Sequence, residues 1–486
     1  MKSPVEVNAR QMAAPLIEAR AWAPYPSRAE AGGGKNPLWT PLDFAFRPGD
    51  RVLLDGPSGC GKSTFLLALA GLLSVQRAWS ETGELRRTDR RRGYLFQNPA
   101  DRFCTVKAED ELAFGLENRG LPPAEIDRLV AEAAHRFGLE TLLDRQVNRL
   151  SGGEQQRLAL AALWAEDPEI LFIDEAMSQL DAAGRCILLA AYDHWSYAHP
   201  EGLAVAVDHR ADLWEGRFTR VLRWRDGSWV ERNKLGDLGL KTTAPIRDGG
   251  RPSAPPAPHP KPNRASGTVV ASCERLVLAR PGGGSRWNHE PIDLKLRAGN
   301  IHVITGPNGA GKSMLLKTIA GLAAAHSGEV RHGPITLRKP PRTKKEWKAL
   351  GARVSMALQN PELQFGAGLV KDHDADPPEN LGLREHLGKS PFELSLGQQR
   401  RLSLSMLGAD RPLLLLDEPF YGQDRGNTRI LIDYIRERAA NGTAVVLVCH
   451  DEDLSHALAD ELFHWDGMRL SRKERKPFYP WWEADR

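Results

Sequence analysis

Leu150-Ser151-Gly152-Gly153-Glu154-Gln155-Gln156-Arg157 is the stretch that decides the fold of this chain. Ser151 is followed three residues later by Glu154, which is the spacing of a capping box at a helix start. Gly152 and Gly153 leave the backbone N–H groups of that helix start open to an anion. The octet therefore predicts a helix whose first turn can hold a phosphate group.

A phosphate-binding loop precedes the octet in the chain. Gly56-Pro57-Ser58-Gly59-Cys60-Gly61-Lys62-Ser63 matches the pattern G-x-x-x-x-G-K-[ST], and it lies between a predicted strand at 52–54 and a helix predicted from Thr64. In such a loop the backbone N–H groups surround phosphate oxygens, Lys62 reaches the β and γ phosphates, and Ser63 binds Mg²⁺. We therefore predict ATP and Mg²⁺ as ligands.

Two carboxylates end the strand that follows the octet. Residues 169–175 read Glu-Ile-Leu-Phe-Ile-Asp-Glu, an apolar run typical of a buried parallel strand. Ligands of open α/β sheets lie at the carboxyl ends of strands. Asp174 is therefore expected to hold Mg²⁺, and Glu175 to polarise the attacking water as general base.

The chain then repeats its own motifs. A second complete loop begins 250 residues after the first and reads Gly306-Pro307-Asn308-Gly309-Ala310-Gly311-Lys312-Ser313, followed by Met314. The later motifs recur in the same order as Gln359-Asn360-Pro361, Ser395-Leu396-Gly397-Gln398, Asp417-Glu418 and His450. An internal duplication is the simplest account. Ser313, Gln359 and Asp417 repeat the predicted metal ligands, and Glu418 repeats the base.

The bulk numbers agree with two domains. A chain of 486 residues is too long for one ordinary core. Residues 231–267 are rich in proline and predict an extended linker between domains at 1–230 and 268–486. The net charge of +4 is too small to suggest that the protein binds nucleic acid. The sequence has no C-x-x-C pair, so it does not predict a zinc site or an iron–sulfur cluster. No apolar run approaches the roughly 18 residues of a membrane span, so at a membrane other chains would have to cross it.

Together these motifs resemble the ATP-binding cassette (ABC) family. The resemblance implies an α/β fold with two tandem P-loop ATPase domains, each with a mostly parallel sheet, an antiparallel β part and a helical subdomain. It implies that Gln97 and Gln359 contact Mg²⁺ and the attacking water, and that His209 and His450 contact the γ-phosphate. It also makes Tyr25 the candidate for stacking on adenine, with an ordinary turn tyrosine as the alternative.

The same resemblance implies that the two cassettes pair head to tail, so that each ATP lies between one loop and the other half's signature. One site would then combine Lys62, Gln97, Asp174, Glu175 and His209 with Ser395 and Gly397. The other would combine Lys312, Gln359, Asp417, Glu418 and His450 with Ser151 and Gly153. Both keep a candidate base, so both are predicted to hydrolyse ATP.

The stretch Phe96-Gln97-Asn98-Pro99-Ala100-Asp101-Arg102, continuing through residues 106–118, resembles the ATPases of energy-coupling-factor (ECF) importers. Arg102 departs from their usual glutamine. The resemblance implies uptake of a vitamin, a vitamin precursor or a transition-metal ion. It also implies a peripheral position on the cytoplasmic face of the membrane, with an integral membrane coupling subunit and a substrate-binding membrane subunit as partners. One chain per transporter and no nucleic acid are expected.

Two other functions are weighed against this one. A soluble double-cassette protein acting on ribosomes or DNA usually has a charged helical linker or zinc modules, whereas this linker is proline-rich. The ATPase of a conventional ABC transporter lacks the stretch that resembles ECF importers. The aromatic tail, residues 477–482, is either a partner contact or, the preferred interpretation, a segment folded onto its own domain.

The two halves also differ in ways that the sequence shows. Leu396 replaces the first signature glycine, which predicts that this signature binds phosphate more weakly. Arg280-Pro281 is aligned with Tyr25-Pro26, so a guanidinium would replace the aromatic ring. From Gln97 to Leu150 the chain runs 53 positions, but from Gln359 to Leu394 only 35, which predicts a shorter helical subdomain in the second half.

Overall fold

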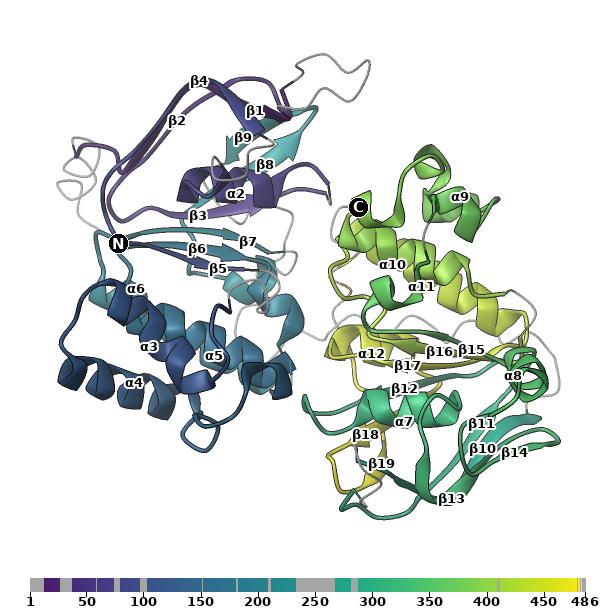
Figure 1. Cartoon of the computed structure of the whole chain (residues 1–486). Coiled ribbons are helices and arrows are strands. Elements are labelled where there is room, and N and C mark those ends of the chain that lie inside the picture. Colours follow the sequence, from purple (N-terminus) through teal and green to yellow (C-terminus); the bar gives the residue numbers. More distant parts are fainter. Residues whose placement is uncertain are drawn as a thin grey trace, which may run out of the picture. The chain divides into compact units, whose positions relative to one another are not determined.

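The computed structural model describes residues 13–26, 37–57, 59–73, 79–96, 103–150, 152–180, 182–208, 211–232, 267–280, 287–366, 368–408, 411–478, 480 and 482. Ser58, Gln97, Ser151 and His209 of the predicted site lie outside these residues, as does most of the predicted linker. The chain divides into two compact units, Met1–Thr242 and Thr243–Arg486 (Figure 1), and each is described by itself.

The first unit is built on a mostly parallel sheet of six strands in the order β5-β6-β7-β3-β8-β9, of which only β9 runs antiparallel to its neighbour. A separate antiparallel sheet has the order β2-β1-β4. The strands are β1 (Ile17–Pro26), β2 (Leu42–Phe46), β3 (Arg51–Asp55), β4 (Trp79–Arg87), β5 (Arg92–Leu95), β6 (Ile170–Asp174), β7 (Leu203–Val207), β8 (Arg220–Arg225) and β9 (Ser228–Arg232). The helices are α2 (Lys62–Ala70), α3 (Ala108–Asn118), α4 (Pro123–Phe137), α5 (Gly152–Ala165) and α6 (Ala182–Ala198).

The parallel strands of the first unit are buried on both faces. On β6, Ile170 and Phe172 pack with α2 and the antiparallel sheet, whereas Leu171 and Ile173 pack with the helices of the other face. This alternation follows from the two-residue period of a strand. It explains why the strand reads as a continuous apolar run, as the sequence predicted.

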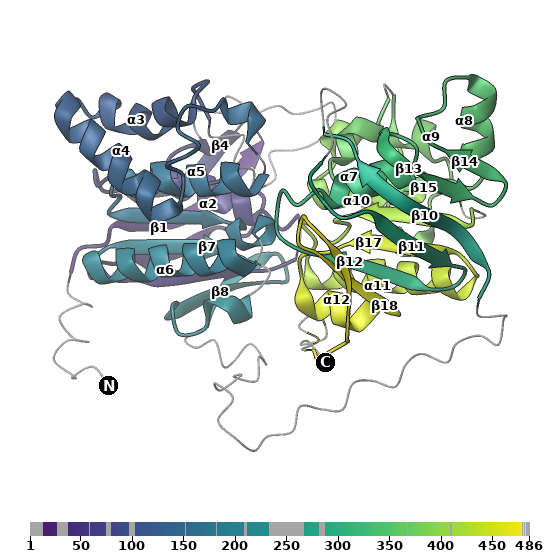
Figure 2. The ribbon, with the colours of Figure 1, turned by 90° about the horizontal axis from the view of Figure 1, so that it is seen from below.

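Helix α4 is bounded by a proline and a glycine. Its first residue is Pro123, and Gly138 closes it with φ of 63°. Proline fits the first turn, since its missing N–H has no partner there, and glycine adopts the left-handed conformation without strain. Figures 1 and 2 show α3 and α4 side by side. They form a helical arm, which we call the first arm (residues 103–149).

The second unit repeats this architecture with the sheet order β15-β16-β17-β12-β18-β19, in which β19 alone is antiparallel to its neighbour. Its antiparallel sheet has the order β11-β10-β13-β14. The strands are β10 (Val269–Leu278), β11 (Ile292–Arg297), β12 (Ile301–Thr305), β13 (Ala325–His332), β14 (Ile335–Leu337), β15 (Val354–Ala357), β16 (Leu413–Asp417), β17 (Ala444–Val448), β18 (Glu461–Trp465) and β19 (Leu470–Lys473). The helices are α7 (Lys312–Ile319), α8 (Lys344–Gly351), α9 (Val370–His373), α10 (Leu396–Ser405), α11 (Arg425–Ala440) and α12 (Glu452–Leu458).

The arm of the second unit is smaller. Within its described residues, the second arm (residues 361–394) contains α9, which is four residues long, and short 3-10 turns that include Pro361–Gln364 and Pro391–Glu393. Helices α3 and α4 of the first arm have 11 and 15 residues. The shortening read from the sequence therefore falls on these two helices.

The same β-bulge appears in both antiparallel sheets. Ala21 has φ of 46° and its N–H donates to Asp43, and Arg275 has φ of 47° and its N–H donates to Asp293. Opposite each lies a glycine, Gly83 or Gly328, whose Cβ would collide with the carbonyl oxygen of the bulge. The bulge thus requires glycine on the neighbouring strand.

The aromatic tail folds onto its own unit. Trp482 is buried in the core formed by α11, α12 and one face of the parallel sheet, and Phe478 stacks on it with ring centroids 6.1 Å apart. The preferred interpretation of the tail is confirmed for these two residues. In the described part of the chain, none of the helices has the length and apolar character needed to cross a bilayer.

The sheets, their parallel strands and the flanking helices confirm the α/β fold predicted for each half. The predicted phosphate loops follow β3 and β12, and the predicted metal and base carboxylates lie at the carboxyl ends of β6 and β16.

Candidate nucleotide site

The loop between β3 and α2 is held closed by its own lysine. Nζ of Lys62 donates to the carbonyl oxygens of Gly56, at 2.9 Å, and Pro57, at 3.0 Å. The side chain is buried, and it points back into the ring of backbone that would surround a phosphate. Gly61 caps α2 with φ of 92° and supports the sharp turn at the helix start.

The second loop has the same arrangement. Nζ of Lys312 donates to Gly306, at 2.8 Å, and Pro307, at 2.7 Å. In both units a tryptophan lies against the last glycine of the loop: a Cβ on Gly61 would meet the ring of Trp39, and one on Gly311 would meet Trp287. Each loop is therefore fixed from inside by lysine and from outside by an indole ring.

The other predicted loop residues lie beside these lysines. Cys60 is half-buried, and burial raises the pKa of its thiol, so that it stays neutral. The hydroxyls of Ser63 and Ser313 lie at the starts of α2 and α7. Described positions of the two predicted loops are Gly56, Pro57, Gly59, Cys60, Gly61, Lys62, Ser63, Thr64, Gly306, Pro307, Asn308, Gly309, Ala310, Gly311, Lys312, Ser313 and Met314.

In the first unit both carboxylate oxygens of Asp174 accept hydrogen bonds. Ser63 Oγ donates to Oδ1 at 3.0 Å, and the Tyr94 hydroxyl donates to Oδ2 at 2.9 Å. Burial and the adjacent charge of Glu175 raise the pKa of Asp174 to about 6. Burial and these carboxylates also raise the pKa of Tyr94, which therefore remains a hydrogen-bond donor.

In the second unit only one oxygen of the matching aspartate is held. Ser313 Oγ donates to Asp417 Oδ1 at 3.0 Å, but Oδ2 is buried without a hydrogen-bond partner among the described residues. The strand register places Met356, which has no hydroxyl, where the first unit has Tyr94. Burial and the charge of Glu418 raise the pKa of Asp417 to about 6.

Glu418 is fixed by its backbone and by a histidine. It has φ of 52°, as Glu175 has φ of 47°, so both glutamates leave the strand in the left-handed conformation. His450 Nε2 lies 2.8 Å from Glu418 Oε1. Burial alone would raise the pKa of Glu418, but the hydrogen bond and charge of His450, with the charges of Lys312 and Arg400, lower it overall. The carboxylate is thereby kept ionised, as a general base requires.

The predicted signature cap is confirmed in the second unit. Ser395 Oγ accepts from the N–H of Gln398 at 3.3 Å, and the Gln398 side chain accepts from the N–H of Ser395 at 3.0 Å. Leu396 is the first residue of α10, which continues through Gly397. In the first unit α5 begins at Gly152 and includes Gly153 and Glu154.

The adenine position differs between the two units. Tyr25 lies on β1, four residues after the bulge residue Ala21. In β10 the strand pairing shifts a second time between Val277 and Leu278, so counting from the bulge residue Arg275 does not fix the residue that matches Tyr25. Arg280, the residue that the sequence aligned with Tyr25, is exposed, and residues 276–280 include no aromatic side chain.

Tyr94 and Arg400 belong to the site but were not predicted from the sequence. Tyr94 acts on a residue 80 positions away, which no local pattern reveals. Arg400 could have been found by comparing the two octets, because it replaces Gln156 on a buried helix face.

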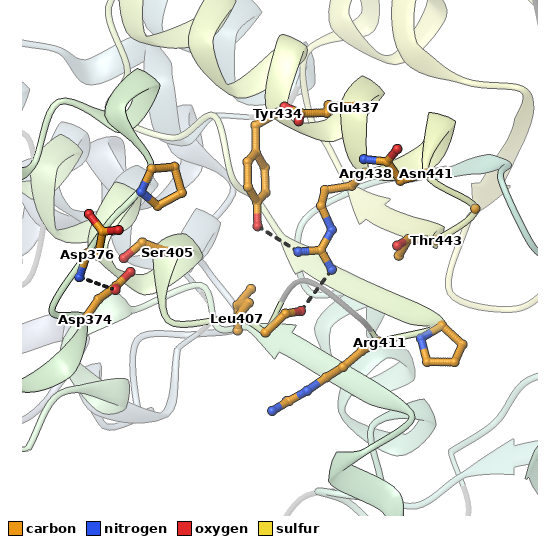
Figure 3. A pocket seen from close by; sticks show the side chains of 14 residues that line it. Asp374, Asp376, Ser405, Leu407, Arg411, Tyr434, Glu437, Arg438, Asn441 and Thr443 are labelled. Atoms are coloured by element: carbon orange, nitrogen blue, oxygen red, sulfur yellow. Dashed lines mark hydrogen bonds between the residues drawn. The ribbon is translucent and has the colours of Figure 1, made fainter. Parts of the chain in front are cut away.

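The second unit also holds a cavity of about 840 Å³ between α10, α11 and the segment around Asp374 (Figure 3). Tyr434, Arg438 and Arg411 line it, and Arg438 donates to the Tyr434 hydroxyl at 3.4 Å. Pro412 and Thr443, which precede β16 and β17, place the cavity at the amino ends of these strands. It is thus separate from the residues around Lys312.

Comparison with known proteins agrees with this geometry. The family model described as ABC transporter matches residues 39–178 and 289–421, more than half of the chain. The putative HMP/thiamine import ATP-binding protein YkoD of Bacillus subtilis is 31% identical, covering 88% of this chain and 86% of its own length. The putative ABC transporter ATP-binding protein SCO2324 of Streptomyces coelicolor is 32% identical, covering 88% and 89%.

Among solved structures, the archaeal ribosome recycling factor aABCE1, in its complex with the stalk protein aP1, has a TM-score of 0.59 at 20% identity. The similarity covers 90% of this chain and 87% of that one, and it shows a shared fold. The duplicated loops, the acidic strand ends and the family match lead to one assignment. The chain belongs to the ABC transporter family and is an ATPase with two cassettes in one polypeptide.

Proposed function

We propose that this protein is the ATP-hydrolysing, energy-coupling subunit of an ECF-type importer, bound to the cytoplasmic face of the membrane. The observation that carries the proposal is an apolar surface on the second arm, directly after the Gln359 segment. The Leu363 and Phe392 side chains are 73% and 57% exposed. Phe365 packs edge-on against Phe392 with ring centroids 6.3 Å apart, and Leu363 lies two residues before Phe365 in the chain. We call these three residues the arm patch.

The arm patch is held by the signature helix. Gln399 of α10 donates to the carbonyl oxygen of Pro391 at 3.2 Å and lies 3.5 Å from Glu362 Oε1. Movement of this patch would therefore reach α10 and the Gln359 segment. The first arm exposes Val106 and Phe114. Exposed apolar groups of this kind on an ATPase fit a membrane partner, here an integral coupling subunit that works with a substrate-binding membrane subunit.

The relative named as an HMP/thiamine import ATP-binding protein covers both cassettes and supports the import direction. It also supports a vitamin or vitamin precursor as cargo, beside the transition-metal ions of the wider class. We further propose that the two cassettes of one chain pair head to tail, with Ser151 and Gly153 completing the Lys312 site and Ser395 and Gly397 completing the Lys62 site.

The residues present fit Mg²⁺ bound with the nucleotide. Ser63 with Asp174, and Ser313 with Asp417, bring hydroxyl and carboxylate oxygens together, which are the ligands that Mg²⁺ prefers. Oδ2 of Asp417 is buried and has no hydrogen-bond partner in the part of the chain that the structure describes, and a hydrated cation would satisfy it. The bound ion would offset phosphate charge during transfer. Gln97 and Gln359 would complete the two ligand sets.

In this mechanism Glu175 and Glu418 accept a proton from the attacking water, while Lys62 and Lys312 leave their loop carbonyls to hold phosphate oxygens. His209 and His450 would contact the γ-phosphate. In addition, the contact with His450 helps to keep Glu418 ionised. Closure on ATP and reopening after hydrolysis would move the membrane partners.

The arm patch provides the test. Leu363→Asp with Phe392→Asp should abolish co-purification with the membrane fraction while the ATPase activity of the free protein stays unchanged. Tyr197→Asp, at a side chain that is 89% exposed on α6, is the control and should remain membrane-bound. Co-sedimentation of the wild-type protein with ribosomes, and not with membranes, would overturn the proposal in favour of a soluble double-cassette protein.

A further inference from the structure

Arg400 is a buried cation at the centre of the second cassette. It lies in the middle of α10 and is only 3% exposed. Its Nη2 donates to the carbonyl oxygen of Gln359 at 2.6 Å. Its Nη1 donates to the carbonyl oxygen of Glu418 and lies 3.4 Å from that of Asp417. The guanidinium also lies 5.6 Å from the ring of Tyr421.

These contacts join three segments that are distant in sequence. Gln359 follows β15, Glu418 follows β16, and Arg400 belongs to the signature helix. A guanidinium is planar and presents its N–H groups in a fixed fork, so it sets the separation of the carbonyl groups that it bridges. Burying a cation is costly unless hydrogen bonds compensate, and here backbone carbonyls provide them.

The first cassette is built differently at this position. Gln156 is the corresponding residue of α5 and is fully buried. Its amide is neutral and shorter, and it lacks the fork of donors that spans two carbonyl groups. The cation is therefore a feature of the second cassette only.

We propose that Arg400 is a positioning residue that locks the Gln359 segment to the carboxyl end of β16. It holds the water-binding glutamine and the base Glu418 at a fixed separation during ATP hydrolysis. Because the arm patch begins four residues after Gln359, the same link carries displacement of the patch to Glu418. This inference rests on the catalytic assignments proposed above.

The test uses Glu175→Gln as background, so that turnover reports on the Lys312 site alone. Arg400→Gln gives this cassette the residue of the other one. It should lower kcat by about ten- to one hundred-fold, because small displacements of reacting groups have effects of this size. KM and the affinity for a fluorescent ATP analogue should stay within about twofold, because Arg400 does not line the phosphate loop. Hydrogen exchange should become faster in peptides covering 354–362 and 413–422.

Arg401→Gln is the matched control. Arg401 is the next residue of α10 and is also buried, at 7% exposed, and its Nε donates to the carbonyl oxygen of Leu381 in the arm at 2.8 Å. Its replacement should leave kcat and both peptides unchanged. Arg400→Lys keeps the charge without the fork, so its kcat should fall between wild type and Arg400→Gln. It also serves as the test variant if Arg400→Gln does not fold.

Three outcomes would overturn the inference: unchanged kcat in Arg400→Gln, the same loss in Arg401→Gln, or a wild-type kcat in Arg400→Lys. Glu418→Gln in the same background separates this result from the catalytic assignment. If that variant retains turnover, Glu418 is not the general base, and the catalytic mechanism in the proposed function is wrong. If it abolishes turnover while Arg400→Gln does not change it, only the role of Arg400 is wrong.

Discussion

The Tyr94 hydroxyl donates a hydrogen bond to Oδ2 of Asp174 at 2.9 Å, so this aspartate, the proposed metal ligand of the first cassette, is held at both oxygens. In the second cassette Met356 stands in its place and Asp417 Oδ2 has no hydrogen-bond partner among the described residues. The described residues therefore hold Asp174 by two hydrogen bonds and Asp417 by one.

Tyr94→Phe should destabilise the ligand-free protein by about 1–3 kcal/mol, because it leaves a buried carboxylate oxygen unpaired. Urea unfolding in EDTA measures this. Tyr192→Phe is the control, since its hydroxyl donates to the Arg217 carbonyl at a longer 3.3 Å. Equal losses of unfolding free energy in the two variants would show that the hydrogen bond to Asp174 contributes no more to stability than the one to Arg217.

Asp417→Asn should stabilise the metal-free protein at alkaline pH. The folded pKa of Asp417, about 6, lies above the ordinary value of 3.8, so the folded state binds the proton more tightly. Wild-type stability therefore increases as pH falls through 6, and above that pH the buried charge costs up to ~3 kcal/mol. The variant's advantage at pH 8 should vanish near pH 4. Asp376→Asn, at an exposed carboxylate, should show no such trend.

Ser151→Arg tests the head-to-tail pairing. In the Glu175→Gln background, where the Lys312 site alone turns over, it should abolish hydrolysis, because its side chain would block the signature that completes this site. In the Glu418→Gln background hydrolysis should persist. Loss in the second background with retention in the first would reverse the assignment of signatures to sites.

Gly83→Ala should unfold the first cassette at lower urea than Gly120→Ala. The two glycines have φ of 67° and 70°, so the backbone strain is matched. A Cβ on Gly83 collides with the Ala21 carbonyl, whereas Gly120 has open space. We expect a loss of about 1 kcal/mol for Gly120→Ala and clearly more for Gly83→Ala. Equal urea midpoints for the two variants would mean that the bulge rearranges to accommodate the new Cβ.

The sequence was sufficient where a motif is local. The loops, the strands that end at Asp174 and Asp417, and helix α4 follow from periodicity, glycine positions and caps. Contacts between distant segments were not predictable, because Tyr94 and Arg400 reach partners 80 and 41 residues away. The bulges at Ala21 and Arg275 were also not predictable, because a bulge adds a residue that no composition signal marks.

The paired bulges at Ala21 and Arg275 also bear on the history of the gene. After duplication both copies kept the same backbone kink, its aspartate and its opposing glycine, but in the second copy the five residues after the kink include no aromatic residue. The stacking on adenine proposed for Tyr25 therefore has no aromatic counterpart in these five residues. We therefore expect the second half to discriminate less between purine nucleotides, so that GTP competes with ATP more effectively there than in the first half.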